Sequence, residues 1–176
     1  MQNREPRRSV RDICFFAMFV AIMLMSRFVT EFLPPNVHLL GLLMAVLTLT
    51  YRGRALVPMY VFILLYGVLR GFSVWWLPYL YVWLPLWGMF MVAGWLRLSA
   101  KFAAPLYAIL CGLHGLMFGL LYAPAQALFF GFSFEMAVAW VVAGFPFDIM
   151  HAVGNLVVGT LIFPLATLMQ KLNGSQ

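Results

Sequence analysis

Long apolar segments run through almost the whole chain, and they restrict its possible folds more than any motif does. Of the 176 residues, 65% are hydrophobic and only 9% are charged, and the mean hydropathy is +0.97. A soluble domain of this size carries about a quarter charged residues and is only about half apolar. Because no water-soluble fold of this length could bury so much apolar surface, the sequence predicts an integral membrane protein.

Six apolar segments are the predicted membrane spans, since a helical crossing needs about 20 residues. They cover residues of about 12–32, 37–51, 55–70, 76–97, 102–122 and 147–170. The apolar stretch 134–170 is too long for one span, and the sequence Gly144-Phe145-Pro146 predicts a break within it. We therefore expect a short interfacial segment at about 134–144, before the sixth span.

No strand-like alternation with turn signals appears in the sequence. The predicted fold is therefore all-α, with six transmembrane helices in one compact bundle that forms a single transmembrane domain over residues 1–176. The N-terminus has a basic start and an apolar run, as signal peptides do. That run is long and lacks a small-residue cleavage site, so we expect it to be retained as the first span.

Basic residues predict the orientation of the bundle through the positive-inside bias. Only Arg27 and Arg70 of the 11 basic residues fall near the outer ends of predicted spans, the first and the third. If the N-terminus is cytoplasmic, the others all lie on the cytoplasmic side: Arg4, Arg7, Arg8, Arg11, Arg52, Arg54, Arg97, Lys101 and Lys171. The sequence thus predicts that both termini are cytoplasmic. The net charge of +6 belongs to the loops and does not indicate nucleic-acid binding.

Polar residues collect on the predicted outer side. The segment FPFDIMHAVGN, residues 145–155, holds Asp148, His151 and Asn155, whose spacing places them on one face of a helix. Ionisable groups inside a membrane are costly and are therefore functional candidates. Further candidates on the same side are Arg27, Asn36, His38, Arg70, Trp75, Trp76, Tyr79 and Gln126. Together they predict an outward-facing pocket with aromatic walls and a few polar anchors.

These candidates also have purely structural interpretations. Tryptophans at a membrane edge are usually interfacial residues, and arginines near helix ends can extend to the lipid headgroups. Asp148 could cap a helix that begins after Pro146. His151, Asn155 and the mid-span His114 could form interhelical hydrogen bonds that only specify packing.

Small residues recur at helical spacing in two predicted spans. Ala17 and Ala21, in the sequence AMFVA of the first span, form a patch that another helix can approach closely. Gly112, Gly115 and Gly119 form a second stripe, which we expect to pack inside the bundle. Neither of the two cysteines has a metal-binding or disulfide spacing, so we expect Cys14 and Cys111 to be packing residues, with no metal or cofactor.

These features resemble the S-components of energy-coupling factor (ECF) transporters, which are small membrane proteins that bind one vitamin or other micronutrient. The resemblance in architecture covers nearly the whole chain. Its best local matches are residues 17–21, 26–28 and 146–155.

The resemblance implies a mechanism and a location, the bacterial or archaeal cell membrane. An S-component captures its substrate in an outward pocket and topples within the membrane, together with a transmembrane coupling protein that two ATPase subunits drive. Ala17 and Ala21 would then contact the coupling protein. The loop around Asn36 and His38 would close the pocket, and the last span, with Asp148, His151 and Asn155, would line it.

The sequence agrees with such a dependent role. It contains no G-x-x-x-x-G-K-[ST] phosphate loop, so we expect no ATPase or other enzymatic activity of its own. It also shows no visible inverted repeat of broken spans, the signature of many secondary transporters. Arg27 and Arg70 could pair with a carboxylate or phosphate, and Trp75, Trp76 and Tyr79 could stack on a flat ring. The predicted substrate is therefore a small aromatic or heteroaromatic micronutrient with an anionic group, such as a folate-like vitamin.

Three other functions remain open from the sequence. A stand-alone proton-coupled carrier could relay protons through Asp148, His151 and His114. An intramembrane enzyme could use Asp148 and His151 with His114 or Glu135 as a metal site or acid–base pair. A structural membrane subunit would bind no small molecule, and only lipid and other subunits would be its partners.

Overall fold

The computed structural model describes residues 10–32 and 38–173, and all regular secondary structure in this part of the chain is helical. The eight α-helices are α1 (Val10–Thr30), α2 (Leu40–Tyr51), α3 (Leu56–Arg70), α4 (Trp83–Ala93), α5 (Ala100–Leu116), α6 (Phe118–Phe130), α7 (Phe134–Gly159) and α8 (Ile162–Asn173). Two short 3-10 helices, η1 (Arg52–Ala55) and η2 (Leu77–Leu80), join α2 to α3 and lead into α4. The prediction of an all-helical fold is confirmed for the described residues.

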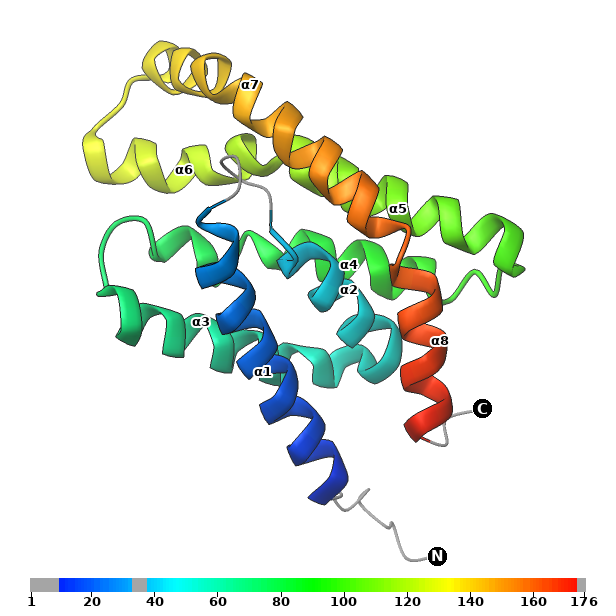
Figure 1. Cartoon of the computed structure of the whole chain (residues 1–176). Coiled ribbons are helices and arrows are strands. Elements are labelled where there is room, and N and C mark those ends of the chain that lie inside the picture. The colour runs from blue at the N-terminus through cyan, green and yellow to red at the C-terminus, as the bar shows by residue number, and fades with distance from the viewer. Residues whose placement is uncertain (1–9, 33–37, 174–176) are drawn as a thin grey trace, which may run out of the picture.

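Helix α2 lies at the centre of the bundle (Figure 1). All of its residues except Thr50 are buried, as expected for a helix that is apolar on every side. Helices α1 and α3 pack against each other on one side of it, and α5 and α7 run side by side on the other. Helix α8 packs against α2 and closes the bundle near the C-terminal end.

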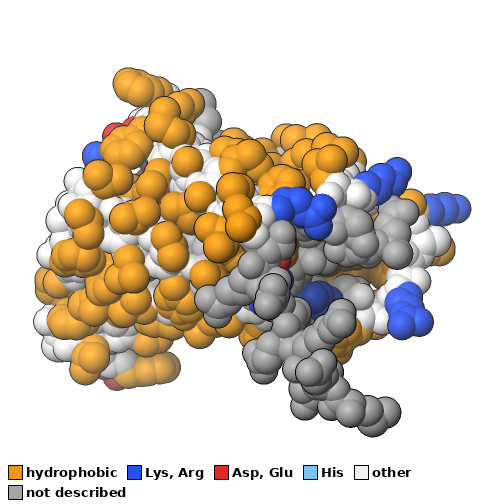
Figure 2. All heavy atoms as spheres, turned by 90° about the horizontal axis from the view of Figure 1, so that it is seen from below, with side chains coloured by type: hydrophobic (Ala, Val, Ile, Leu, Met, Phe, Trp, Pro, Cys, Tyr) orange, Lys and Arg blue, Asp and Glu red, His pale blue; other side chains and the backbone are white. Residues whose placement is uncertain are grey.

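Four helical segments are long and apolar enough to cross a membrane: Val10–Thr30, Leu40–Arg70, Ala100–Phe130 and Phe134–Gly159. A shorter apolar segment covers Leu77–Ala93. Large apolar side chains are exposed along most of these segments, and Figure 2 shows them as a broad face with charged side chains only toward its ends. Such a surface suits contact with lipid better than contact with water.

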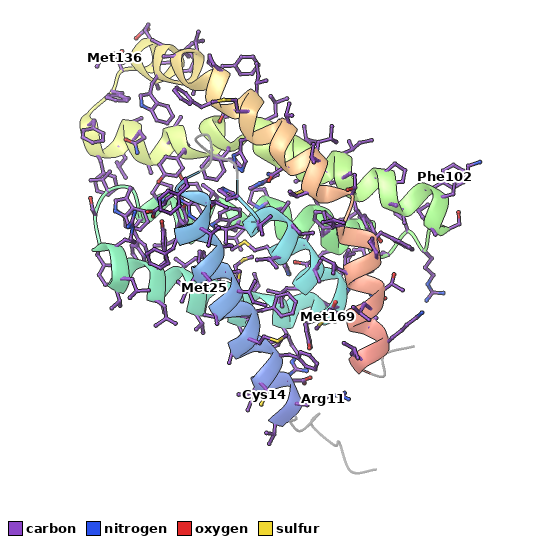
Figure 3. The ribbon with its side chains drawn as sticks, viewed as in Figure 1. Arg11, Cys14, Met25, Phe102, Met136 and Met169 are labelled. Carbon is purple, nitrogen blue, oxygen red and sulfur yellow. The ribbon has the colours of Figure 1, made fainter. Side chains whose placement is uncertain are left out.

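The charged and apolar parts of the surface are separated along the molecule. Lys and Arg side chains gather at one end of the face in Figure 2. In Figure 3, Arg11 lies near the end of α8, whereas Met136, at the start of α7, lies at the opposite end. Arg11 Nη1 donates a hydrogen bond to the carbonyl oxygen of Leu172 at 3.3 Å, so the first and last described helices meet at the basic end.

Two expected helix boundaries are wrong. Helix α7 runs without interruption through Gly144-Phe145-Pro146, and the break comes later, at Thr160 and Leu161 before α8. Helix α6 likewise continues through Pro124 to Phe130, after a turn at Met117. A proline removes only one backbone hydrogen bond, and long apolar helices tolerate this loss where neighbouring groups compensate.

Glycines allow α5 and α7 to approach closely. A Cβ atom added to Gly115 would lie 2.9 Å from the backbone of His151 and Ala152, and one added to Gly159 would lie 2.9 Å from Cα of Ala108. At Gly112 the nearest atom would be the carbonyl oxygen of Ala152, at 3.3 Å. Two members of the predicted internal glycine stripe, Gly112 and Gly115, therefore lie on α5 and pack against α7, whereas the third, Gly119, lies on α6 beside Asp148.

Alanine substitutions at two glycines should change stability in opposite directions. Gly115→Ala should lower the free energy of unfolding by about 1–3 kcal/mol, because the α7 backbone must move away. Gly144→Ala in α7 is the control, since nothing lies within 4 Å of its added Cβ, and it should raise stability by about 0.4–1 kcal/mol. Unfolding of the purified protein in detergent measures both changes. Equal effects at the two sites would contradict the close contact.

Candidate functional site

A polar cavity lies among the ends of α1 and α3, the segment around η2, and α6. Its volume is about 610 Å³. The cavity is lined by Arg27, Tyr66, Leu69, Arg70, Trp75, Tyr79 and Tyr122. It therefore brings together four of the predicted site residues, namely Arg27, Arg70, Trp75 and Tyr79. We refer to it as the arginine pocket.

The two arginines of the arginine pocket differ in their partners. Arg70 forms a 2.6 Å ion pair with Glu31, so its charge is largely compensated. Arg27 is half-buried, and its Nε and Nη2 atoms donate to the hydroxyl oxygen of Tyr66 at 3.4 Å each. Neither of the ion pairs found among the described residues involves Arg27. Its guanidinium is thus the stronger candidate for binding an anion.

Two series of side chains lead from the arginine pocket into the bundle. Trp75, Tyr79 and Trp83 follow one another at ring-centroid distances of 5.7 and 5.8 Å. On the other side, Tyr122 lies 5.5 Å from Phe118, which lies 6.1 Å from His114. Members of each series are four residues apart, although the first series runs from a turn through η2 into α4 and the second from α5 into α6.

The two series end at a buried group that we call the histidine cluster: His38, Trp83, His114, Phe118 and His151. The His151 ring lies 4.7 Å from that of His38 and 4.8 Å from that of Phe118. The Trp83 and His114 rings stack at 5.4 Å. The histidines and Trp83 are each 5% exposed or less. The predicted site residues His38 and His151 therefore meet here rather than in the arginine pocket.

Most polar atoms of the histidine cluster lack a hydrogen-bond partner in the described part of the chain. These atoms are His38 Nδ1, Trp83 Nε1, His114 Nδ1 and both ring nitrogens of His151. His114 Nε2 lies 2.8 Å from the carbonyl oxygen of Val82. A carbonyl can only accept, so this nitrogen carries the proton and Nδ1 of the same neutral ring is an acceptor.

The histidine cluster carries no compensating negative charge. Of the described residues, no Asp or Glu forms an ion pair with any of the three histidines. Burial holds the pKa of His38 well below its usual range, and the neighbouring His151 and Arg27 lower it further. His38 is therefore neutral at pH 7.

Asp148 and Asn155 join helices to one another. Asp148 Oδ1 accepts a hydrogen bond from the backbone amide of Gly119 at 3.0 Å, which is in the first turn of α6. The carboxylate therefore caps α6. It does not cap a helix that begins after Pro146, because α7 already begins at Phe134. Asn155 Nδ2 donates to the carbonyl oxygen of Cys111 on α5 at 3.2 Å. Both residues are buried on the side of α7 that faces α5.

The remaining predicted site residues lie elsewhere. Trp76 Nε1 donates to the carbonyl oxygen of Ile63, in α3, at 2.8 Å. The polar atom of Trp76 therefore already has a hydrogen-bond partner. Gln126 is half-buried on α6 and does not line the arginine pocket. Asn36 lies outside the described residues.

Sequence reasoning missed several residues that form the two sites. Tyr66 and Tyr122 line the arginine pocket, and Tyr122 also donates a hydrogen bond to the carbonyl oxygen of Trp75. Trp83 and Phe118 belong to the histidine cluster, and His114 was considered mainly as a packing residue. A repeated spacing of four, over residues 75–79–83 and 114–118–122, was the signal that could have found them.

An apolar groove of about 640 Å³ lies between α1 and α3, away from both sites. Ala17 and Ala21 are exposed and line it. The other lining residues are Asp12, Ile13, Phe16, Val20 and Leu24 from α1, with Arg54, Val57, Pro58, Val61 and Leu65 from η1 and α3. Asp12 and Arg54 form a 2.8 Å ion pair across it. The lining of the groove is mostly apolar and includes the alanine patch, where another helix can approach closely.

No family model, curated protein or solved structure matches the chain. In the described part of the chain, no group of three or more His, Cys, Asp and Glu side chains could hold a metal ion. Any functional conclusion therefore depends on the chemistry of the arginine pocket, the histidine cluster and the α1–α3 groove.

Removing the Asp148 carboxylate should uncap α6. We expect Asp148→Ala to lower the free energy of unfolding in detergent by about 1–2 kcal/mol, since the buried amide of Gly119 loses its acceptor. Asp148→Asn retains a carbonyl oxygen at the same place and should keep most of the stability. If the two variants are equally destabilised, the negative charge matters more than the hydrogen bond.

Proposed function

We propose that this chain is the substrate-binding S-component of an ECF-type importer in a bacterial or archaeal cell membrane. Its substrate would be a small anionic aromatic or heteroaromatic micronutrient. The observation that carries the proposal is the arginine pocket. There the guanidinium of Arg27, which forms no ion pair with any described residue, lies beside the aromatic walls formed by Tyr66, Trp75, Tyr79 and Tyr122.

The chemistry of the arginine pocket suits such a ligand. A guanidinium binds a carboxylate or phosphate through two parallel hydrogen bonds, and its partly buried position strengthens the attraction relative to water. Aromatic walls favour a flat ring by stacking and by excluding water. A volume of about 610 Å³ lies within the range of about 300–1,000 Å³ that is usual for small-molecule sites.

The distribution of charge supports an outward-facing arginine pocket. Helix α1 begins at the basic end, where Arg11 contacts Leu172, and Arg27 lies in its last turn. If the basic end is cytoplasmic, in agreement with the positive-inside bias, the pocket opens on the outer side and both termini lie inside.

The α1–α3 groove supports a partner in the membrane. Its floor contains Ala17 and Ala21, which leave room for the close approach of a helix. In the proposed function, the transmembrane coupling protein packs here, and its two ATPase subunits provide the energy. The groove and the arginine pocket share no lining residue, so ligand binding and coupling can be separated by mutation.

A stand-alone proton-coupled carrier is the second candidate, because three histidines lie in one buried cluster. Uptake by the purified chain alone, in liposomes with an imposed proton gradient, would support this alternative. An S-component would show no turnover there without its ATPase partners.

Native mass spectrometry of the detergent-purified protein tests the proposed function directly. We expect one co-purifying anionic, ring-containing compound near a one-to-one ratio. Arg27→Gln should weaken its binding by about tenfold to a hundredfold, because a charge-assisted hydrogen bond is lost. The exposed Arg97→Gln is the matched control and should bind normally. A protein that carries no compound and binds none from a vitamin panel would refute the proposal.

Filling the α1–α3 groove should block transport but not binding. The double variant Ala17→Leu with Ala21→Leu should reduce ATP-dependent uptake by about tenfold or more, because overpacking an interface costs about 1–3 kcal/mol per site. Its affinity for the substrate should stay unchanged. Ala139→Leu with Ala143→Leu is the control, since these alanines are also exposed and four residues apart, on α7. Equal loss in both double variants would argue against a specific interface.

A further inference from the structure

We infer that the histidine cluster is a second compartment of the same binding site, and that it receives a neutral hydrogen-bonding ring of the substrate. This inference rests on the proposed function and specifies its substrate class. The ligand would have two parts: an anionic group at Arg27, and a heterocycle that carries both donors and acceptors, such as a ring with a lactam or amidine edge.

The unpaired polar atoms of the histidine cluster are the first observation. A buried polar group without a hydrogen bond is destabilising, and most buried polar groups in folded proteins are paired. Here His38, Trp83, His114 and His151 all carry such atoms within one set of touching rings. A ligand that forms hydrogen bonds to these atoms would remove the destabilisation, and this would favour the binding of a neutral polar ring.

The balance of donors and acceptors defines the chemistry of this ring. Trp83 Nε1 is a donor only, and His114 Nδ1 is an acceptor, because Nε2 of the same ring donates to Val82. A neutral His151 ring presents one donor and one acceptor, and both are free. An anion would be repelled by the acceptor nitrogens of the cluster, and a cation would be repelled by its N–H donors. A neutral group with both functions fits this set best.

The arginine pocket and the histidine cluster are neighbours, separated by packed aromatic rings. Tyr79 and Tyr122 line the pocket, and their rings lie 5.8 and 5.5 Å from those of Trp83 and Phe118. None of the described hydrogen bonds involves the Tyr79 side chain, so this ring can turn aside without breaking one. A ligand ring that passes Tyr79 reaches the cluster while its anionic end stays near Arg27.

Two flat bicyclic carboxylates serve as probes in the test. Pterin-6-carboxylate has a neutral ring with donors and acceptors, whereas 2-naphthoate has a ring of similar size with none. Calorimetric titration of the full chain in detergent should show about tenfold to a hundredfold tighter binding of pterin-6-carboxylate. Trp83→Phe and His151→Phe keep a ring in place and remove the nitrogens. Each should lower this preference about tenfold, while binding of 2-naphthoate changes little.

Trp76→Phe is the matched control, because its Nε1 is already bonded to Ile63 and it lies outside the histidine cluster. It should leave the preference unchanged. Arg27→Gln should weaken both probes equally. If Arg27→Gln weakens both but Trp83→Phe and His151→Phe leave the preference intact, the arginine pocket stands and the second compartment is refuted. If wild type binds neither probe and carries no compound, the proposed function and this inference both fail.

Stability of the ligand-free protein gives an independent measurement. If the nitrogens of His151 serve a ligand, then His151→Phe replaces unsatisfied polar atoms by apolar ones, and the melting temperature should rise by about 2–4 °C. If the imidazole only stabilises the fold, the melting temperature should fall, which would overturn the inference. Stabilisation of wild type by Zn²⁺ or Ni²⁺ alone, lost in His151→Phe, would overturn it in favour of a metal site.

Discussion

The close contact between α5 and α7 determines the geometry of most of the molecule. Because Gly112 and Gly115 let the α7 backbone approach, His151 can lie beside the rings carried by α5 and α6. The same approach brings Asp148 to the amide of Gly119, and this bond fixes where α6 begins. Phe118 and Tyr122 then face the interior and the arginine pocket. The glycine contact therefore helps to position His151 and Phe118 in the histidine cluster and Tyr122 in the arginine pocket.

The structure separates two kinds of recognition that the sequence placed in one pocket. The Arg27 guanidinium and the tyrosine and tryptophan walls lie in the arginine pocket, whereas the histidine rings lie in the histidine cluster behind it. Such a division is physically reasonable, since Arg27 remains partly solvated while the three histidines are each 5% exposed or less. A charged group is costly to bury, so the cluster would accept a neutral part of a ligand more readily than an anionic one.

The sequence predicted those features that depend on local pattern. Apolar composition and the lack of alternation predicted an all-helical fold, and the spacing of Asp148, His151 and Asn155 correctly placed them on one face of α7. The helix boundaries were not predictable in this way, because the start of α6 depends on a bond between Gly119 and a residue 29 positions later. The pocket walls Tyr66 and Tyr122 come from helices whose adjacency the sequence does not reveal.

The hydrogen bond from Tyr122 to the carbonyl of Trp75 has a consequence for motion. Helices α5 and α7 are locked together by glycine packing and should move as one rigid body, carrying the start of α6 with them through Asp148. Trp75 belongs to the opposite wall, next to α3. Any widening of the arginine pocket between these walls must therefore break the Tyr122–Trp75 hydrogen bond. Loss of this bond should make the open conformation of the pocket more populated.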